Sequence, residues 1–460
     1  MIVDKLGKAI RHLIIVVGCL SGLPALAQVS LYAPPKDFDY AIDFEVLVDG
    51  QKTFVYHNRV AAFTAFSFSG EIEVAVVYPG SIHEVDIRPR NLDIRHVVRG
   101  DTILFTLMRP ANLSIEVNRN LRRPLFIFAN GHGPEAPPRA PNVYYFEGGK
   151  VHDAGSITLK DDDIVYIEGG AVVRGSFNLE NCNRVHIYGH GILSAEGLYK
   201  KGEARMIGIA RSKDITIEGI IINDSRHWTM PCSNSENIVY RNVKLISGND
   251  WDDGIDIVSS RNVLVDGCFI RTKDDCIAIK GGISFLDRQY SQTTASDIEV
   301  ANCVLWNAEW GNGLEIGFET RCDTIRNIVF RNIDIIHVEG NEGTFSIHNG
   351  DRALVQNVLY ENIRVEDAHG ILIDFKILES RYSRDKERGR IQNIEFRNIV
   401  VDNFTGPGSI LMGYDENHKV SNVSLSNVVV NGKRITSAAD LNLRLKFASS
   451  VRFGVGDSGQ

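Results

Sequence analysis

The sequence has little of what marks membrane proteins and nucleic-acid-binding proteins. After residue 27 it has no apolar run of the roughly 18 residues that a membrane helix needs. Its net charge of −8 gives no basic footprint for nucleic acid or for an anionic membrane surface. The same charge argues mildly against a polyanionic substrate. With 43% apolar and 23% charged residues, the composition is that of a globular protein.

Cysteine is also scarce, with seven residues in a chain of 460. Cys19 lies near the start, and the spacing of the other six matches no small disulfide-rich domain. Cys268 and Cys303 fall in apolar runs, which favours buried thiols that act as small hydrophobic side chains. Disulfides stay an alternative because the context described next permits them. The six cysteines are Cys182, Cys232, Cys268, Cys276, Cys303 and Cys322.

Residues 1–27 read as a targeting segment. Three basic residues precede an apolar run that ends in Ala25-Leu26-Ala27, the A-x-A pattern of a signal-peptide cleavage site. This predicts a bacterial-type secretory signal, cleavage after Ala27, and a secreted or periplasmic protein. A lipoprotein anchored at Cys19 is the alternative, because residues 16–19 resemble a lipobox.

Residues 28–140 contain short runs of alternating apolar and polar residues at a spacing of about 8–14 residues. This pattern predicts an N-terminal β-sandwich domain. The stretch GPEAPPRAPN at 133–142 reads as a linker. We therefore place a second domain at 141–460.

The second domain carries a repeat of eight residues: apolar, any, apolar, any, Asn or Gly, apolar, any, apolar. The nine copies begin at residues 185, 215, 238, 263, 298, 328, 358, 394 and 423. Asn or Gly in the fifth place indicates a corner with a left-handed backbone between two short strands. Because one copy buries little apolar surface alone, the copies must stack. We predict an all-β protein, a right-handed parallel β-helix preceded by an N-terminal β-sandwich.

Two acidic stretches stand out within the repeats, GNDWDDGIDI at 248–257 and TKDDCIAIKGG at 272–282. Asp253 and Asp275 are separated by 22 residues, close to one coil, so Asp252, Asp253, Asp274 and Asp275 are expected to cluster on neighbouring rungs about 4.8 Å apart. Such a cluster could hold calcium. It could also hydrolyse glycosides, with one protonated carboxyl and one carboxylate that activates water.

The acidic stretches, together with WGNGLEIGFET at 310–320, resemble the core of polygalacturonases, glycoside hydrolase family 28. Their N-T-D and D-D motifs align with Asp253 and with Asp274-Asp275. The chain departs from the family in three ways: Asn312 replaces the His of G-H-G, no R-I-K follows, and Asp252 stands where Thr is common. Across its whole length the chain is similar to the dextranase and isopullulanase family, family 49, whose members join a sandwich to a β-helix and act on neutral α-glucans.

This resemblance implies an inverting glycoside hydrolase that needs no metal or organic cofactor. Asp274 would be the general acid, and Asp253 with Asp275 would hold and deprotonate water, with acid and base about 6.5–9.5 Å apart. The expected substrate is an α-linked polysaccharide or oligosaccharide. We expect it to be neutral, as dextran- and pullulan-like α-glucans are. The alternatives are a pectin hydrolase with a divergent subsite, a non-catalytic carbohydrate-binding β-helix, and a calcium-dependent lyase that uses Lys280.

Further polar and aromatic residues near these rungs are candidates for substrate binding. Trp228 and Trp251 could form aromatic platforms, Asn312 and Glu315 could bind sugar hydroxyls, and Lys280 could pair with the aspartates. The predicted set is His227, Trp228, Trp251, Asp252, Lys280, Asn312 and Glu315. His348, Asp374 and Lys376 fall near later rungs. We expect a monomer whose partner is the glycan.

Overall fold

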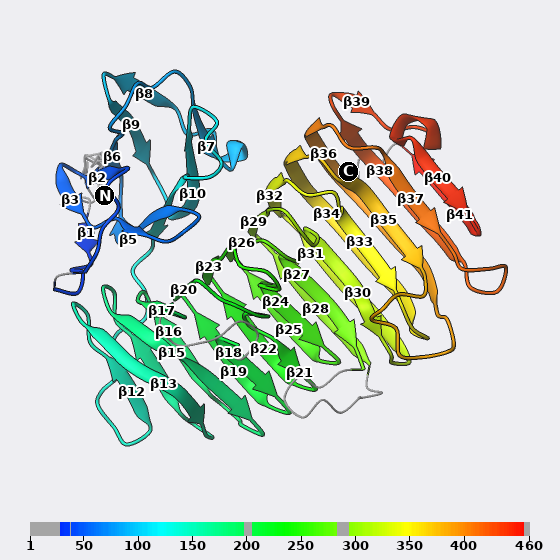
Figure 1. The fold of residues 1–460 in the computed structure, drawn as a ribbon, viewed down its shortest axis with the longest axis horizontal. Coiled ribbons are helices and arrows are strands. Elements are labelled where there is room, and N and C mark those ends of the chain that lie inside the picture. The colour runs from blue at the N-terminus through cyan, green and yellow to red at the C-terminus, as the bar shows by residue number, and fades with distance from the viewer. Residues whose placement is uncertain (1–27, 37, 197–204, 283–293, 455–460) are drawn as a thin grey trace, which may run out of the picture.

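The computed structural model describes residues 28–36, 38–196, 205–282 and 294–454. The predicted signal segment and its alternative lipobox at Cys19 lie outside the described residues. Two all-β bodies follow one another along the chain, a small sandwich and a long coil of parallel strands (Figure 1). None of the helices in these described ranges has the length and apolar content to cross a membrane.

The N-terminal body is a sandwich of two sheets, as the alternating pattern predicts. On β6, for example, Ile72, Val74 and Val76 are buried while the residues between them face outward. The first sheet contains β1 (Gln28–Leu31), β4 (Tyr56–His57), β5 (Ala62–Ser69), β7 (Val85–Arg88), β10 (Ala111–Val117) and β11 (Leu125–Asn130). The second contains β2 (Glu45–Val48), β3 (Gln51–Thr53), β6 (Ile72–Val77), β8 (His96–Arg99) and β9 (Thr102–Leu107). A short 3-10 helix, Arg90–Leu92, follows β7.

The second body is a right-handed parallel β-helix whose strands stack in three sheets. Sheet 1 contains β18 (Ile207–Ala210), β21 (Cys232–Ser233), β24 (Ile255–Val258), β27 (Ile277–Gly281), β30 (Leu314–Thr320), β33 (Gly343–Asn349), β35 (Ile371–Ile377), β37 (Ser409–Met412) and β40 (Leu443–Lys446). Sheet 2 contains β12 (Val143–Phe146), β14 (Ile164–Ile167), β16 (His186–Gly189), β19 (Lys213–Glu218), β22 (Glu236–Arg241), β25 (Arg261–Asp266), β28 (Ala295–Ala301), β31 (Thr324–Arg331) and β41 (Ala448–Gly454). Sheet 3 contains β17 (Ile192–Ser194), β20 (Ile221–Asn223), β23 (Lys244–Ile246), β26 (Phe269–Thr272), β29 (Val304–Asn307) and β32 (Asp334–Val338).

Longer strands run around the corners between these sheets. They are β13 (Val151–Leu159), β15 (Val172–Glu180), β34 (Leu354–Ala368), β36 (Arg390–Phe404) and β38 (Val420–Val430). β39 (Lys433–Arg434) pairs antiparallel with β38, and a 3-10 helix, Ala438–Leu441, precedes β40. The six cysteines are all buried free thiols in the core of the coil, which confirms the prediction of hydrophobic thiols.

The fifth residue of every repeat copy lies at a corner with positive φ, as predicted. The φ angle is 49° at Asn242, 57° at Asn302 and 52° at Asn427. From Asn302 onward these Asn side chains form a ladder, in which each Nδ2 donates to the Oδ1 of the previous coil. The repeat pattern therefore records both the left-handed corner and the stacking of its side chains.

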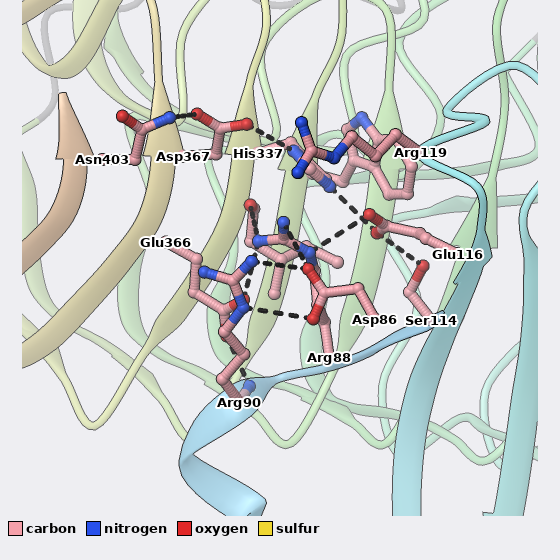
Figure 2. A network of polar contacts seen from close by, with 12 residues as sticks. Asp86, Arg88, Arg90, Ser114, Glu116, Arg119, His337, Glu366, Asp367 and Asn403 are labelled. Atoms are coloured by element: carbon pink, nitrogen blue, oxygen red, sulfur yellow. Dashed lines mark hydrogen bonds and ion pairs between the residues drawn. The ribbon is translucent and has the colours of Figure 1, made fainter. Parts of the chain in front are cut away.

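The sandwich packs on the outer face of sheet 3, over the coils from the N-terminal end of the β-helix to β32 (Figure 1). Phe126 packs against Phe269 and Trp306, with ring centroids 4.8 Å and 5.8 Å away. A buried polar network lies at one edge of this contact (Figure 2). There Arg88 of the sandwich donates to Glu116 at 3.1 Å and to Glu366 of the coil at 2.8 Å.

Candidate active site

Sheet 1 brings the acidic stretches together. Ile255 pairs with Ile277, so Asp253 lies beside Asp275 on the next rung, as the 22-residue spacing predicts. Asp253, Asp274 and Asp275 each place a carboxylate oxygen within 4.8 Å of the other two. They line a cavity of about 740 Å³ on the outside of the coil. The cluster is thus an accessible site on a rigid stack of strands.

The three carboxylates have different neighbours. Burial, followed by the charge of Asp253, raises the pKa of Asp274 to about 7. Burial, followed by the charges of Asp253, Asp274 and Glu315, also raises the pKa of Asp275, although its Oδ1 accepts hydrogen bonds from the backbone N and the side-chain Nδ2 of Asn312 at 2.7 Å and 2.8 Å. Like charges at this spacing cannot all be ionised. The pair of Asp274 and Asp275 therefore favours holding a proton, and Asn312 fixes the orientation of Asp275.

Lys280 neutralises the remaining carboxylate. Its Nζ lies 3.1 Å from Asp253 Oδ2 and 2.9 Å from Asp256 Oδ1, and 3.8 Å from the ring centre of Trp228. Burial opposes the charged form, but Asp256 and Asp253 outweigh it and raise the pKa of Lys280. Lys280 thus pairs with the aspartates as predicted. Asp256 was not predicted, although its place between two inward residues of β24 marks it as outward-facing.

Aromatic side chains flank the acids. Trp251 and Trp310 are 53% and 57% exposed, and with His227 and Trp228 they line the cavity. His227 Nδ1 accepts the backbone N–H of Trp228 at 2.7 Å, and burial lowers the pKa of His227 to about 4. His227 is therefore a neutral ring. Trp310 was missed, although it stands two residues before Asn312.

Gly311, the first glycine of the G-N-G sequence, lies where no larger residue fits. It has a φ of 66°, and an added Cβ would lie 2.4 Å from the backbone N of Asp275 and 2.6 Å from Asp274 Oδ1. Only glycine allows the chain to pass this close to the acidic pair. The loop can then place Asn312 against Asp275.

Three of the predicted substrate-binding residues are buried, and their contact with substrate stays a prediction. Asp252 and Glu315 are 0% exposed: Asp252 accepts backbone hydrogen bonds, and Glu315 contacts His348 Nδ1 at 3.1 Å. Asn312 is 1% exposed but lines the cavity, and its Oδ1 accepts from Gly343 N and Ser346 Oγ. Asp252 and Glu315 support the site from within the protein, and Asn312 supports Asp275 at the cavity wall.

The other candidates on later rungs continue along sheet 1 from Glu315. His348 contacts Asp374 at 3.2 Å, and Lys376 donates to the same carboxylate at 2.7 Å. The His348 ring stacks on Phe318 with centroids 4.3 Å apart. Phe318 in turn contacts Tyr382 at 5.5 Å. Phe318, Glu319, Glu342, Arg381 and Tyr382 all line the cavity, and none was predicted.

The spacing of the acids is shorter than expected. Oxygens within 4.8 Å do not reach the 6.5–9.5 Å predicted from an inverting pair, so the distance prediction is not met. Three carboxylates at this spacing could also hold a cation. Lys280 already occupies one face of Asp253 at 3.1 Å, and its positive charge opposes a second cation there.

Comparisons with known proteins agree with this geometry. The model of Glycosyl hydrolases family 28 matches residues 150–447. Polygalacturonases of Juniperus ashei and Chamaecyparis obtusa are 26% and 27% identical over 50% and 52% of this chain. The matched regions cover 43% and 45% of those relatives, so the chain spans less than half of their length.

Two solved structures share the fold. Dex49A from Penicillium minioluteum has a TM-score of 0.66 at 15% identity and covers 92% of this chain and 96% of its own. An exopolygalacturonase from Thermotoga maritima has a TM-score of 0.56 at 18% identity, with 68% and 84% covered. The likeness to Dex49A includes the sandwich and the coil. Because the family match spans most of the β-helix and all three clustered acids, the chain belongs to glycosyl hydrolases family 28.

Proposed function

We propose that this glycoside hydrolase cleaves α-glycosidic bonds in a polysaccharide or oligosaccharide, with Asp274 as the general acid. The observation that carries the proposal is the trio of carboxylates within 4.8 Å beside exposed indole rings. Asp274, with its raised pKa of about 7, can protonate the leaving oxygen. Asp253 and Asp275 can hold and deprotonate the attacking water.

The neighbours support this division of roles. Lys280 Nζ lies 3.1 Å from Asp253 Oδ2, and Asn312 directs two N–H donors at Asp275 Oδ1. In their ionised forms both carboxylates can accept a proton from water. Inversion is typical of the family. We keep it as a proposal because the acids lie closer together than the spacing expected of an inverting pair.

A neutral α-glucan is the first candidate substrate. The cavity is lined by Asp250, Glu319 and Glu342 in addition to the three clustered acids, and this surplus of negative charge repels a polyanion. Trp251 and Trp310 offer flat apolar rings that can stack on the faces of neutral sugars. From the N-terminal pattern we further propose export, to the periplasm or the exterior.

A uronate-containing glycan is the second candidate, and Arg381 favours it. The Arg381 guanidinium lies 4.7 Å from the ring centre of Tyr382 at the edge of the cavity. No salt bridge to Arg381 occurs among the described residues. A guanidinium held in this way can bind a sugar carboxylate bidentately.

The test is hydrolysis of dextran, pullulan and polygalacturonate by the purified protein, with product anomers followed by NMR. Hydrolysis with inverted anomers supports the proposal, and retention would contradict the assignment of Asp253 and Asp275 to water. Binding without turnover would indicate a non-catalytic lectin. Loss of activity with a chelator and recovery with calcium would indicate a lyase instead.

A further inference from the structure

Asp252 joins two successive coils of the site although it does not reach the cavity. It lies in the loop between β23 and β24 and is 0% exposed. Its Oδ1 accepts the backbone N–H groups of Lys273 and Asp274 at 2.8 Å and 2.9 Å. Its Oδ2 accepts the N–H of Asn249 at 3.0 Å. One carboxylate thus ties the loop that carries Asp253 to the loop that carries Asp274.

These bonds are part of a complete set that fixes Asp274. The carbonyl of Asp274 accepts from Thr272 Oγ1 and from Asn307 Nδ2, both at 2.8 Å. Its Oδ1 accepts the N–H of Asp275 at 3.0 Å. In the described part of the chain, Asp274 Oδ2 makes no hydrogen bond. The backbone and one carboxyl oxygen are therefore held, and the other oxygen is left for the leaving group.

A neutral side chain could not reproduce this arrangement. Three N–H donors reach two separate oxygens, which a single hydroxyl does not offer, and N–H bonds to a carboxylate are about twice as strong as bonds to a neutral acceptor. Burial raises the pKa of Asp252 to about 6, against the lowering effect of its backbone bonds and of Arg271. Above that pH, Asp252 is a buried negative charge.

That charge acts on Asp274. The groups that face Asp274 are Asp253, Lys280, Asp252 and Asp275. After burial, the charges of Asp253 and Asp252 raise the pKa of Asp274, while Lys280 lowers it. Asp252 is the member of this group that lies outside the cavity, so its charge can be removed without touching the space for substrate.

We propose that Asp252 is a positioning residue that fixes the backbone of Asp274 and, by its negative charge, favours the protonated form of Asp274. This inference rests on the proposed function, because its effect is exerted on the general acid. It also accounts for an acidic residue at a place where the resemblance to polygalacturonases leads one to expect Thr.

The test is the pH dependence of kcat for the wild type, Asp252→Asn, Asp252→Thr and Asp252→Glu. The two neutral variants should shift the alkaline limb down by about one pH unit, with KM nearly unchanged. Asp252→Glu keeps the charge and should keep the limb near its wild-type position, even at a lower rate. If the alkaline limb of both neutral variants stays at its wild-type pH, the proposal is wrong. Two neutral variants are included so that the test can still be made if one of them does not fold.

Asp351 offers a matched control away from the acids. It is also 0% exposed and accepts three backbone N–H groups, those of Thr320, Arg384 and Asp385. Asp351→Asn should lower stability and leave the alkaline limb in place. If it moves the limb as far as Asp252→Asn does, a general loosening explains the effect and the proposal is wrong.

A measurement without substrate separates this inference from the proposed function. Amide hydrogen exchange at residues 273 and 274 should be faster in Asp252→Asn than in the wild type, because both N–H groups lose a charged acceptor. A wild type that hydrolyses no glycan would contradict the proposed function. Unchanged exchange in an active enzyme would contradict the role of Asp252.

Discussion

At the scale of single residues, Asp253 and Asp274 show how neighbouring carboxylates come to lie in different electrostatic surroundings. Lys280 lies 3.1 Å from Asp253, whereas Asp274 has burial and two further carboxylates around it. The local surroundings, more than the residue type, divide acid from base. Activity and stability at this site should therefore both depend on pH.

The alkaline limb of the rate profile should lie near pH 7. The general acid must be protonated, and the pKa of Asp274 is raised to about 7, so kcat should fall as the pH rises through this value. The measurement is kcat at saturating substrate from pH 4 to 9. A rate that stays constant to pH 9 would contradict the assignment of Asp274.

Asp274→Asn should abolish most activity and yet stabilise the protein. The acid contribution is worth about 10²–10⁴-fold in rate. Because the folded-state pKa of Asp274 lies above its ordinary value, the ionised form costs stability that grows as the pH rises toward 7. The variant should thus gain more in Tm at pH 8 than at pH 5. The exposed Asp402 supplies a control, and Asp402→Asn should show no such gain.

The sequence predicted which acids meet, but not which way every side chain points. The 22-residue spacing is enough to place Asp253 beside Asp275. Asp252 turns inward because the chain reverses at Trp251, which has a φ of 63°, and no residue type signals that turn. Glu315 is buried against His348 of the next coil, which lies 3.1 Å away, and such packing comes from residues that the local sequence does not show.

At the scale of elements, the Asn corners carry the regularity of the coil. Each fifth-place residue adopts positive φ, and from Asn302 onward the side chains bond in a ladder. The eight-residue template made these corners predictable because the positive φ and the side-chain ladder both favour Asn. The irregular loops between the repeat copies form part of the cavity wall, including Tyr382. Because these loops do not follow the repeat, the sequence pattern does not predict their positions.

Asn362 allows the contributions of the positive φ and of the ladder hydrogen bonds to stability to be measured separately. Its φ is 54°, its Nδ2 donates to Asn332 and its Oδ1 accepts from Asn398. Asn362→Ala should cost about 2 kcal/mol, from the left-handed backbone and the lost bonds. Asn362→Gly should cost about 1 kcal/mol, because the backbone stays relaxed. Chemical denaturation measures both, and equal costs would mean that the corner backbone contributes nothing.

At the scale of the whole molecule, the polar network at the junction connects the sandwich to the coil. His337 lies 2.9 Å from Glu116 of the sandwich and 3.6 Å from Asp367 (Figure 2). Burial disfavours the charged ring, but Asp367 and Glu116 outweigh it and raise the pKa of His337. Burial raises the pKa of Glu366 to about 7. The alternating sequence predicted the sandwich, whereas this contact joins residues more than 200 positions apart.

The junction should weaken as the pH rises. Both groups have folded-state pKa values above their ordinary ones, so their contribution is present at low pH and is lost as the pH rises through those values. His337→Gln should lower Tm at pH 6 by a few degrees and have little effect at pH 9. Calorimetry at the two pH values tests this, and an equal loss at both would contradict a charged His337.

The placement of the sandwich has a mechanical consequence. Its apolar contacts reach successive coils from Val172 to Ile336, while in the described part of the chain β35, β37 and β40 lie beyond them. Under a pulling force applied to the C-terminus, the last coils should detach one at a time, each releasing a length of about 30 residues. The coils beneath the sandwich, which include the acidic trio, should then yield together at a higher force.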